Sequence, residues 1–544
     1  MAKKTQKLSI RLLREGFQPE DAVRENVQLS DWPKIKDSKI ALGTVGGLSP
    51  KWAGFLELTK AEASSVINLS AFGVLFVSAA KRWFAISFGL GHVKLEPAAF
   101  EQDFGLRVVM NSVDPLQLKS ADVRTPDENT LSRRSQTSRG SDQTAFAIDV
   151  ERDIVRGLAG KPKDPAFASR VAGSDTLSLD RKATLIDVPD ICSEAFTVYQ
   201  KPDYRAEFGW IDQIRHVRDG DLIKKLNQQA AAAVEGALVD KIPAVLNLAY
   251  PVIYDPEKAR EIRYKGFGSG AIYADLDMAG YIDALKKKEV KAFSANNLHT
   301  HSVHEVDDDG KDAGGKWSVG ECLVFETDLD GHKYVLSGGR WYRIASDLAK
   351  AVADFFATVN LIDLPEAEED ENEATYNGRI SKAGVGLLCL DRKLVKPSGA
   401  SSPIEACDFI SLKKELIHIK DQTSSSRLSH LFNQGTVSAR VLKVDGLFRD
   451  GVRKEIAQQQ VTLKLAGFDD VIPTSTVELI PGEYIVVYAV LSSSDQPKLP
   501  FFSLVTFRQS SRELQAFGYK FAFSWIKKPA AKKPIGKAKR KKKA

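Results

Sequence analysis

Three polar side chains that could take part in hydrolysis lie close together between residues 404 and 434. Asp408 stands in the run PIEACDFIS, and His418 and Lys420 stand in the next run, ELIHIK. Hydrolysis of a phosphodiester needs a divalent cation held by oxygen ligands, an acidified water and a positive charge near the attacked phosphate. A carboxylate, an imidazole and an ammonium group at this spacing are candidates for those roles.

The elements that must position these side chains are two short strands joined by a turn at Lys413–Lys414. Both runs are rich in apolar residues, which is typical of a hairpin. Alternation along ELIHIK places His418 and Lys420 on one face of the second strand. We therefore expect Asp408 and Lys420 to reach the same rim of a sheet, with His418 beside Lys420.

Further elements are expected around this hairpin. A polar loop with three serines leads into a helix that carries His430 and Gln434 on one face, at i and i+4. The serines suit a helix cap or a phosphate contact; they are Ser424, Ser425 and Ser426. With strands at 385–391, 483–491 and 520–526 and helices at 427–444 and 506–517, the expected order is αβββαβαβ.

The spacing of Asp408 and His418-Ile419-Lys420 resembles the D…(D/E)xK signature of the PD-(D/E)xK, or restriction-endonuclease-like, nuclease superfamily. The resemblance covers the C-terminal third and implies an αβββαβ core, an endonuclease and an Mg²⁺ or Mn²⁺ cofactor. It implies that Asp408 binds the metal and that Lys420 orients the attacking water or offsets charge. By the same analogy, the Ile419 carbonyl is a metal ligand and Gln434 supports the lysine or touches the substrate.

One position departs from that signature. His418 stands where the family has its second acid, and imidazole can bind a metal or accept a proton but lacks the charge of a carboxylate. An acid from elsewhere can take the role, and Glu373, in a segment expected to be helical, is the preferred metal ligand. Glu405, Glu415 and Glu371 could take the role in its place. Without such an acid the site is inactive or unusual.

The whole chain also resembles an uncharacterised, sporadically distributed bacterial family of similar length, from KLSIRLLREG through HKYVLSGGRWYRI to LSHLFNQG. Such a distribution is typical of mobile defence genes and implies cleavage of phage or plasmid nucleic acid, with DNA favoured over RNA. Two further functions stay open. The chain could bind nucleic acid through a degenerate, non-catalytic nuclease fold, or it could be a regulatory subunit of a defence complex.

Composition indicates a cytoplasmic globular protein with several domains. The 544 residues are 43% hydrophobic and 27% charged, the balance of a soluble protein. The chain has no apolar run of about 18 residues, and the charged start MAKKTQKLSIRLL does not suit a signal peptide. We therefore expect no membrane partner, whereas a homo-oligomer remains possible. The four cysteines form no CxxC pair, so neither a zinc ribbon nor a disulfide framework is indicated.

Two basic segments are candidates for contact with nucleic acid. Residues 527–544 carry ten Lys or Arg and no acid, so the formal charge of +6 leaves 6 − 10 = −4 for residues 1–526. This tail, with Lys539 and Arg540, is expected to be disordered and to attract phosphate, unless it only aids solubility or is a nuclear signal. Residues 120–144 are expected to form a long loop whose Arg133 and Arg134 contact phosphate, or a solvated insertion.

The expected fold class is α/β, or α+β overall, with one or two α+β domains before the nuclease domain. An N-terminal α+β domain is expected at 1–175, with strands GVLFVSA and RWFAISFGL around an Ala-Lys-Arg turn. A middle α+β domain is expected at 176–340, with a helix at 222–239 and a hairpin at Asp330-Gly331. The nuclease domain is expected at 341–526, starting with the amphipathic helix SDLAKAVADFFATV.

Other motifs give weaker signals. The run LHTHSVHEVDDDG gathers His299, His301 and His304, but their spacing fits neither one strand face nor the i, i+4 pattern of a helical zinc site, so a surface turn is favoured. The sequence contains no P-loop, which speaks against a nucleotide-driven motor. It also shows no local signature of Ser-His-Asp or Cys-His catalysis.

Overall fold

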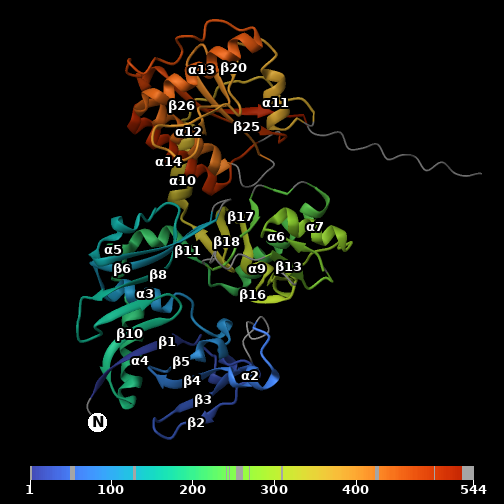
Figure 1. The fold of residues 1–544 in the computed structure, drawn as a ribbon. Helices are drawn as coiled ribbons and strands as arrows, with labels where there is room; N and C mark the ends of the chain where they lie inside the picture. Colours follow the sequence, from blue (N-terminus) through green and yellow to red (C-terminus); the bar gives the residue numbers. More distant parts are fainter. Residues whose placement is uncertain are drawn as a thin grey trace, which may run out of the picture. The chain divides into compact units, whose positions relative to one another are not determined.

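The computed structural model describes residues 3–48, 56–126, 130–240, 242–243, 245–252, 261–268, 270–307, 310–369, 371–422, 428–494 and 497–529. Helices and strands are both abundant, which confirms the α+β class (Figure 1). The described residues form two compact units, one within 1–125 and 132–212 and the other within 126–131 and 213–544.

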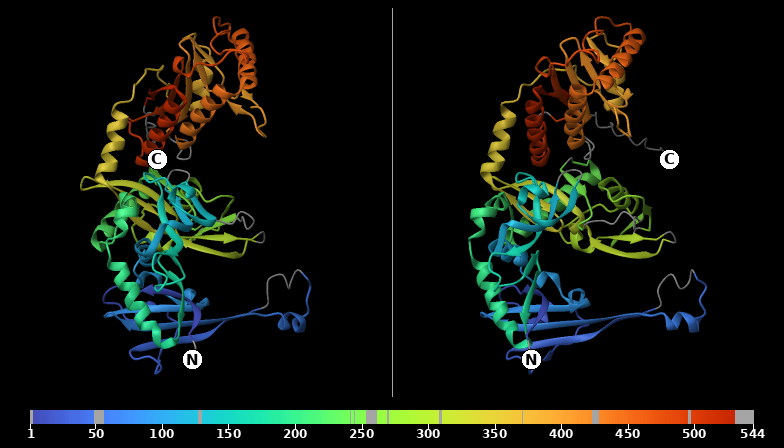
Figure 2. Two further views of the ribbon diagram at one scale, coloured as in Figure 1. Left: turned by 90° about the vertical axis from the view of Figure 1, so that its left-hand side faces the viewer. Right: turned by 60° about the vertical axis from the view of Figure 1, so that its left-hand side comes forward.

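A ten-stranded sheet forms the first unit, with the strand order β2-β3-β4-β5-β1-β10-β9-β8-β6-β7. Its strands are β1 (Lys4–Leu12), β2 (Ser30–Asp31), β3 (Ser38–Leu48), β4 (Asn68–Ala79), β5 (Arg82–Gly89), β6 (Val113–Thr125), β7 (Leu131–Ser141), β8 (Ile154–Pro162), β9 (Arg170–Gly173) and β10 (Leu177–Ala183). Strands β3 and β4 continue as a long ribbon beyond the body of the unit (Figure 2). Helices α3 (Phe104–Ser112) and α4 (Val188–Gln200) contribute buried residues to its core.

The expected N-terminal strands are confirmed. Strands β4 and β5 pair antiparallel around Ala80 and Lys81, whose φ angles of 48° and 60° are left-handed. Positive φ at both central residues is the geometry that a two-residue hairpin requires. The unit runs past residue 175, because Leu179 of β10 pairs with Leu8 of β1.

Residues 120–144 are largely extended strand, so the expected long loop is wrong. Strands β6 and β7 cover most of this segment, and β7 lies at the edge of the sheet. An edge strand needs no apolar alternation, because much of it faces water, and charged residues there discourage pairing with other chains. The polar composition of this segment therefore reflects its place at the edge of the sheet.

The first part of the second unit contains two small antiparallel sheets, with the orders β11-β19-β18-β17-β12 and β14-β13-β15-β16. The strands are β11 (Ile214–His216), β12 (Leu246–Leu248), β13 (Glu261–Lys265), β14 (Ile272–Tyr273), β15 (Ser302–Val306), β16 (Asp312–Ser318), β17 (Leu323–Leu329), β18 (His332–Ser337) and β19 (Arg340–Ile344). The helices are α6 (Gly220–Val239), α7 (Met278–Lys287), α8 (Asn297–Thr300) and α9 (Val319–Cys322). The hairpin at Asp330-Gly331 and the helix at 222–239 are thereby confirmed.

The C-terminal part of this unit is built on the sheet β20-β23-β24-β25-β26. The strands of this sheet are β20 (Leu387–Cys389), β23 (Phe409–Ser411), β24 (Glu415–Asp421), β25 (Ile485–Ser492) and β26 (Lys520–Lys527). A separate short pair consists of β21 (Leu394–Val395) and β22 (Ile404–Glu405). The helices are α10 (Ser346–Ala357), α11 (Glu373–Ile380), α12 (Leu428–Val444), α13 (Gly446–Leu463) and α14 (Phe501–Phe517).

Both pairing directions occur in this sheet. Strands β20, β23 and β24 pair antiparallel, whereas β24, β25 and β26 run parallel. Helices α12 and α14 share a core with one face, which includes Leu416 and Tyr488. The other face packs Ile417 and Ile419 against Tyr376 of α11. The strands of this sheet follow the expected order, whereas helix α13 and strand β21 are additions that the sequence pattern did not predict.

Candidate functional site

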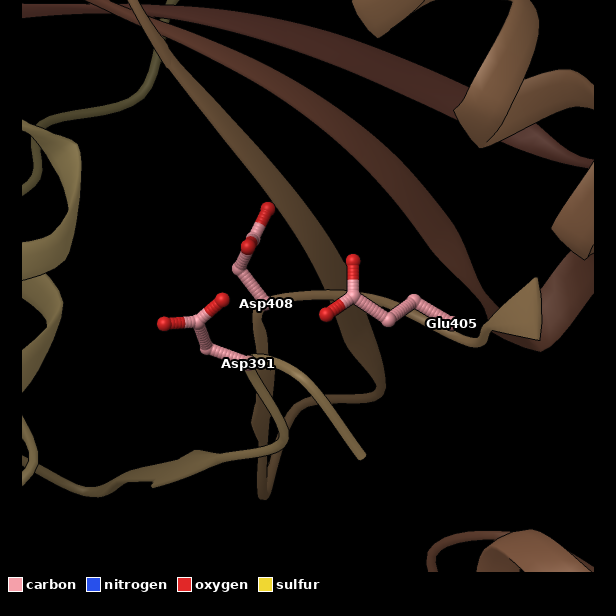
Figure 3. A group of neighbouring side chains, drawn as sticks. All are labelled: Asp391, Glu405 and Asp408. Atoms are coloured by element: carbon pink, nitrogen blue, oxygen red, sulfur yellow. The ribbon is translucent and has the colours of Figure 1, made fainter. Parts of the chain in front are cut away.

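Three carboxylate side chains converge beside strands β20 and β23. Asp391, Glu405 and Asp408 each offer one oxygen atom, and these atoms all lie within 4.8 Å of one another (Figure 3). Asp408 is only 1% exposed, and the other two residues are half-buried. Among the described residues, no other group of three His, Cys, Asp or Glu side chains approaches so closely. Oxygen ligands at this spacing form a candidate site for a hard divalent cation.

Strand pairing explains why these residues meet. Strands β20 and β23 are antiparallel neighbours, and the Leu390 N–H continues their ladder by donating to the Asp408 carbonyl at 2.7 Å. Asp391 therefore leaves the end of β20 beside the start of β23. After Asp391 the chain forms the β21–β22 pair, in which Leu394 lies opposite Glu405. This pair brings Glu405 back to a point just before Asp408.

The Asp408 carboxyl group is buried and only half hydrogen-bonded. Its Oδ2 atom accepts the Ile419 N–H at 2.8 Å, whereas its Oδ1 atom has no hydrogen-bond partner in the described part of the chain. Burial raises the pKa of Asp408 to about 8; the Ile419 N–H and Lys420 oppose the rise, and Glu405 and Glu373 add to it. A buried oxygen without a partner, beside other acids, is expected where a cation completes the site. The three carboxylates therefore fit Mg²⁺ or Mn²⁺.

Gln434 forms a hydrogen bond with one of these carboxylates. Its Nε2 atom donates to Glu405 Oε2 at 3.0 Å, and the Arg392 N–H donates to Glu405 Oε1. Gln434 lies on α12, so this helix links the acidic cluster to the core beneath it. Hydrogen bonds of this kind to a ligating carboxylate commonly raise metal affinity.

Lys420 acts electrostatically on Asp408, but its hydrogen-bond partner is Glu373. The Lys420 Nζ atom lies 2.5 Å from Glu373 Oε1, and the two side chains are 15% and 17% exposed. Glu373 begins α11 and does not belong to the acidic cluster. Its carboxylate therefore holds the lysine, whereas the sequence interpretation made it a metal ligand.

His418 is placed away from the cluster of ligand atoms. The side chain is fully buried, its Nε2 atom lies 3.4 Å from Ser438 Oγ on α12, and its ring centre is 6.3 Å from that of Tyr488. Burial lowers the pKa of His418 to about 3, and Lys420 contributes to this lowering, so the ring stays neutral at ordinary pH. The structure thus places His418 in the core and not among the three carboxylates.

The remaining predicted residues are dispersed. His430 is exposed on α12. In the first unit, Arg133 pairs with Asp153, and Arg134 Nη2 lies 2.7 Å from Asp122 Oδ2. Both arginines therefore have carboxylate partners within the first unit. The other predicted contacts with nucleic acid, namely Ser424, Ser425, Ser426, Lys539 and Arg540, lie outside the described residues.

Sequence reasoning missed Asp391 and ranked Glu405 below Glu373. No local pattern marks Asp391, because its approach to Asp408 depends on the pairing of β20 with β23. Glu415 and Glu371 are engaged elsewhere in the fold. Glu415 Oε2 accepts from Ser411 Oγ at 2.7 Å, and Glu371 accepts from Arg379 at 2.7 and 2.8 Å.

The histidines of the run 298–310 do not share a site. His299 is exposed on α8, whereas His301 is buried with its Nδ1 atom 2.7 Å from the Tyr281 hydroxyl. His304 bonds Ser302 and Asp312 in the adjoining sheet. The three do not form a metal-ligand cluster in the described part of the chain.

Comparison with known proteins places the chain in a family without assigning it an activity. Residues 8–527 match the family described as "Family of unknown function (DUF6119)", so the chain belongs to that family. No curated protein and no solved structure matches it. Within the described residues, none of the helices is long and apolar enough to cross a membrane.

Proposed function

We propose that this member of a family of unknown function is a metal-dependent nuclease whose site comprises Asp391, Glu405, Asp408 and Lys420. The observation that carries the proposal is the buried Asp408 carboxyl group, which has one oxygen without a hydrogen-bond partner among the described residues. It belongs to a cluster of three carboxylates, and the positive charge of Lys420 acts on it electrostatically. Burying acids together is costly, and strongly perturbed groups of this kind cluster at functional sites.

Each side chain has a part in phosphodiester hydrolysis. Mg²⁺ or Mn²⁺, when bound, would acidify a water molecule and offset the charge of the phosphate. The three carboxylates hold this cation, and Gln434 fixes the orientation of Glu405. Lys420 donates hydrogen bonds to the attacking water or to a phosphate oxygen, where positive charge favours the transition state. Glu373 keeps the lysine ammonium group near the cluster.

The topology of the C-terminal sheet supports the same proposal. The antiparallel run β20–β23–β24, followed by α12 and by β25 parallel to β24, matches the core implied by the resemblance to PD-(D/E)xK nucleases. In that comparison Asp408 and Lys420 take the positions of the signature aspartate and lysine. Asp391 and Glu405 supply the negative charge that His418 lacks.

The proposed substrate is nucleic acid, with DNA favoured over RNA, and the proposed setting is defence against phage or plasmids in the bacterial cytoplasm. Support comes from the resemblance to sporadically distributed bacterial proteins and from the ten basic residues of 527–544. Such a basic segment attracts phosphate backbones by a force that weakens as salt is added.

The test is cleavage of end-labelled DNA and RNA, single- and double-stranded, by the purified full-length protein with Mg²⁺, Mn²⁺ or a chelator. The site variants are Asp408→Asn and Lys420→Met. The matched controls are Asp470→Asn, whose side chain is fully exposed, and Lys413→Met in the exposed β23–β24 turn.

The proposal expects cleavage by the wild type and both controls, and none by the site variants or after chelation. Equal cleavage by all variants would show that the site lies elsewhere. Salt-sensitive binding without cleavage under any cation would favour the degenerate nucleic-acid-binding fold. Absence of binding at low salt would favour a regulatory subunit.

A further inference from the structure

A hydrogen-bonded relay of serine, histidine and aspartate lies on the β13–β15–β16 sheet. Ser302 Oγ is 2.9 Å from His304 Nε2, and His304 Nδ1 is 3.1 Å from Asp312 Oδ2. Ser302 and His304 are two positions apart on β15 and so share one face of the sheet. The relay shares no residue with the acidic cluster described above.

The donors and acceptors of the three side chains decide which nitrogen of His304 carries the proton. Hydrogen bonds from Lys265 lower the pKa of Asp312, whose carboxylate can then only accept. The shared proton therefore lies on His304 Nδ1, which leaves the Nε2 lone pair to accept from the Ser302 hydroxyl. Burial is the largest influence on His304 and lowers its pKa, so the ring is neutral and able to act as a base near neutral pH.

The β15–β16 ladder is irregular at the point where Asp312 contacts His304. On β15 the pairing moves from His304 to Val306, while on β16 it moves from Lys316 to Asp312, so β16 carries extra residues at this point. Gly314 lies in this bulge with φ of 118°, a conformation that suits glycine. Bulges re-aim side chains and are frequent beside functional sites. Here the bulge accompanies the placement of the Asp312 carboxylate against the His304 ring.

The serine is partly exposed, and a lysine on the neighbouring strand binds the aspartate of the relay. Ser302 is half-buried, whereas His304 beside it is 8% exposed. Lys265 pairs with Ser302 in the β13–β15 register, and its Nζ atom lies 2.8 Å from both carboxylate oxygens of Asp312. The Lys265 ammonium group thereby keeps Asp312 ionised, as the acceptor that His304 Nδ1 needs.

We propose that Ser302 is an activated nucleophile that takes up an acyl or phosphonyl group, with His304 as its base and Asp312 orienting the histidine. The Ser302 oxygen forms a bond to the acyl carbon of an activated ester, and its proton passes to His304 Nε2. The bond to the leaving alcohol breaks, and the alcohol departs with that proton. The product is an ester on Ser302, and no other reactant is needed.

The experiment is labelling of the full-length protein near neutral pH with a biotinylated phosphonofluoridate, followed by intact mass and peptide mapping. In this reaction the serine oxygen bonds to phosphorus and fluoride leaves. The variants are Ser302→Ala, His304→Gln and Asp312→Asn, each checked for its melting temperature. Ser318→Ala is the matched control, because Ser318 lies opposite Ser302 in the β15–β16 ladder.

The expected result is a single adduct on Ser302 that forms in the wild type and in Ser318→Ala and is absent in Ser302→Ala. Loss of a general base should slow labelling of His304→Gln by about a hundredfold. The proposal is overturned if the wild type is unlabelled, if the adduct is spread over several serines as in heat-denatured protein, or if a folded His304→Gln reacts at the wild-type rate. If a variant does not fold, the wild type alone tests the proposal. Its adduct must then lie on Ser302 and must form faster than adducts form on the denatured protein.

Discussion

Lys420 Nζ and Glu373 Oε1 lie 2.5 Å apart, although 47 positions separate the two residues in the sequence. The pair joins the end of β24 to the first turn of α11. Because both side chains are largely shielded from solvent, their attraction is screened less than that of a surface pair. In the proposed nuclease site, the task of Glu373 is to hold the lysine near the three carboxylates.

Replacement of Glu373 should therefore impair the placement of Lys420. We expect Glu373→Gln to lower kcat for nucleic-acid cleavage by about a hundredfold, because a small displacement of a reacting group can cost that much. The Kd for Mn²⁺ should change little. Steady-state kinetics and calorimetric titration with Mn²⁺ measure the two quantities. The exposed Glu369→Gln is the control, and a loss of Mn²⁺ affinity in Glu373→Gln with kcat unchanged would make Glu373 a ligand instead.

Cation binding should stabilise the folded protein through Asp408. We expect Mn²⁺ at about a hundredfold excess over its Kd to stabilise the unit that binds it by about 2.7 kcal/mol, because it binds only the folded state. Asp408→Asn should abolish the rise in melting temperature, and Asp470→Asn should retain it. Differential scanning calorimetry provides the measurement. The same Mn²⁺-induced rise in both variants would exclude Asp408 from the cation site.

Gln434 should act on metal affinity through Glu405. Gln434→Leu removes the 3.0 Å hydrogen bond to the Glu405 carboxylate, so the Kd for Mn²⁺ should rise about tenfold or more. Asn433→Ala, at the exposed neighbouring position on α12, should leave the Kd unchanged. Titration calorimetry on both variants tests this. Equal affinities would mean that the hydrogen bond does not orient the ligand.

The helices and strands around this site were largely predictable from the sequence, whereas the three carboxylates that make up the acidic cluster were not. Strands around Asp408 and Lys420 and the helix with Gln434 followed from apolar runs and local spacing. Asp391 escaped notice because its approach to Asp408 depends on which strands pair, and strand pairing leaves no mark in local spacing. The extended segment 120–144 escaped notice because an edge strand can be polar throughout.

His418 should be dispensable for cation binding. Its ring is buried in the core, near the Tyr488 ring and 3.4 Å from Ser438 Oγ, so His418→Leu puts an apolar side chain in an apolar environment. We expect the Kd for Mn²⁺ to change by less than about threefold, since no metal ligand is removed. The Mn²⁺ titration of this variant is the check. A loss of affinity as large as that of Asp408→Asn would restore His418 as a ligand.

Acid should destabilise the first part of the second unit through His301. Burial lowers the pKa of His301, so below about pH 6.5 the unfolded chain takes up a proton that the folded state resists. The stability that the neutral ring contributes is present above that pH and is lost as the pH falls. We expect the melting temperature of the wild type to drop more than that of His301→Gln between neutral and mildly acidic pH. Parallel curves for the two proteins would contradict this.

The contacts of His418 and Glu373 differ from the sequence prediction for one physical reason. In the sequence both residues looked able to complete the metal site, because spacing does not distinguish a side chain in the core from one that faces a neighbouring charge. The fold separates them, since α12 covers His418 and α11 brings Glu373 against Lys420. Tertiary packing, and not local pattern, decides where these two side chains lie.

The most direct test of the nuclease proposal is the cleavage rate of end-labelled DNA by Asp391→Asn in saturating Mn²⁺. Asp391 belongs to the three-carboxylate cluster but not to the signature that the sequence resembles, so it tests the structural site itself. The proposal predicts that this variant cleaves at least about a hundredfold more slowly than the wild type, while Asp470→Asn retains the full rate. Wild-type cleavage by a folded Asp391→Asn would contradict it.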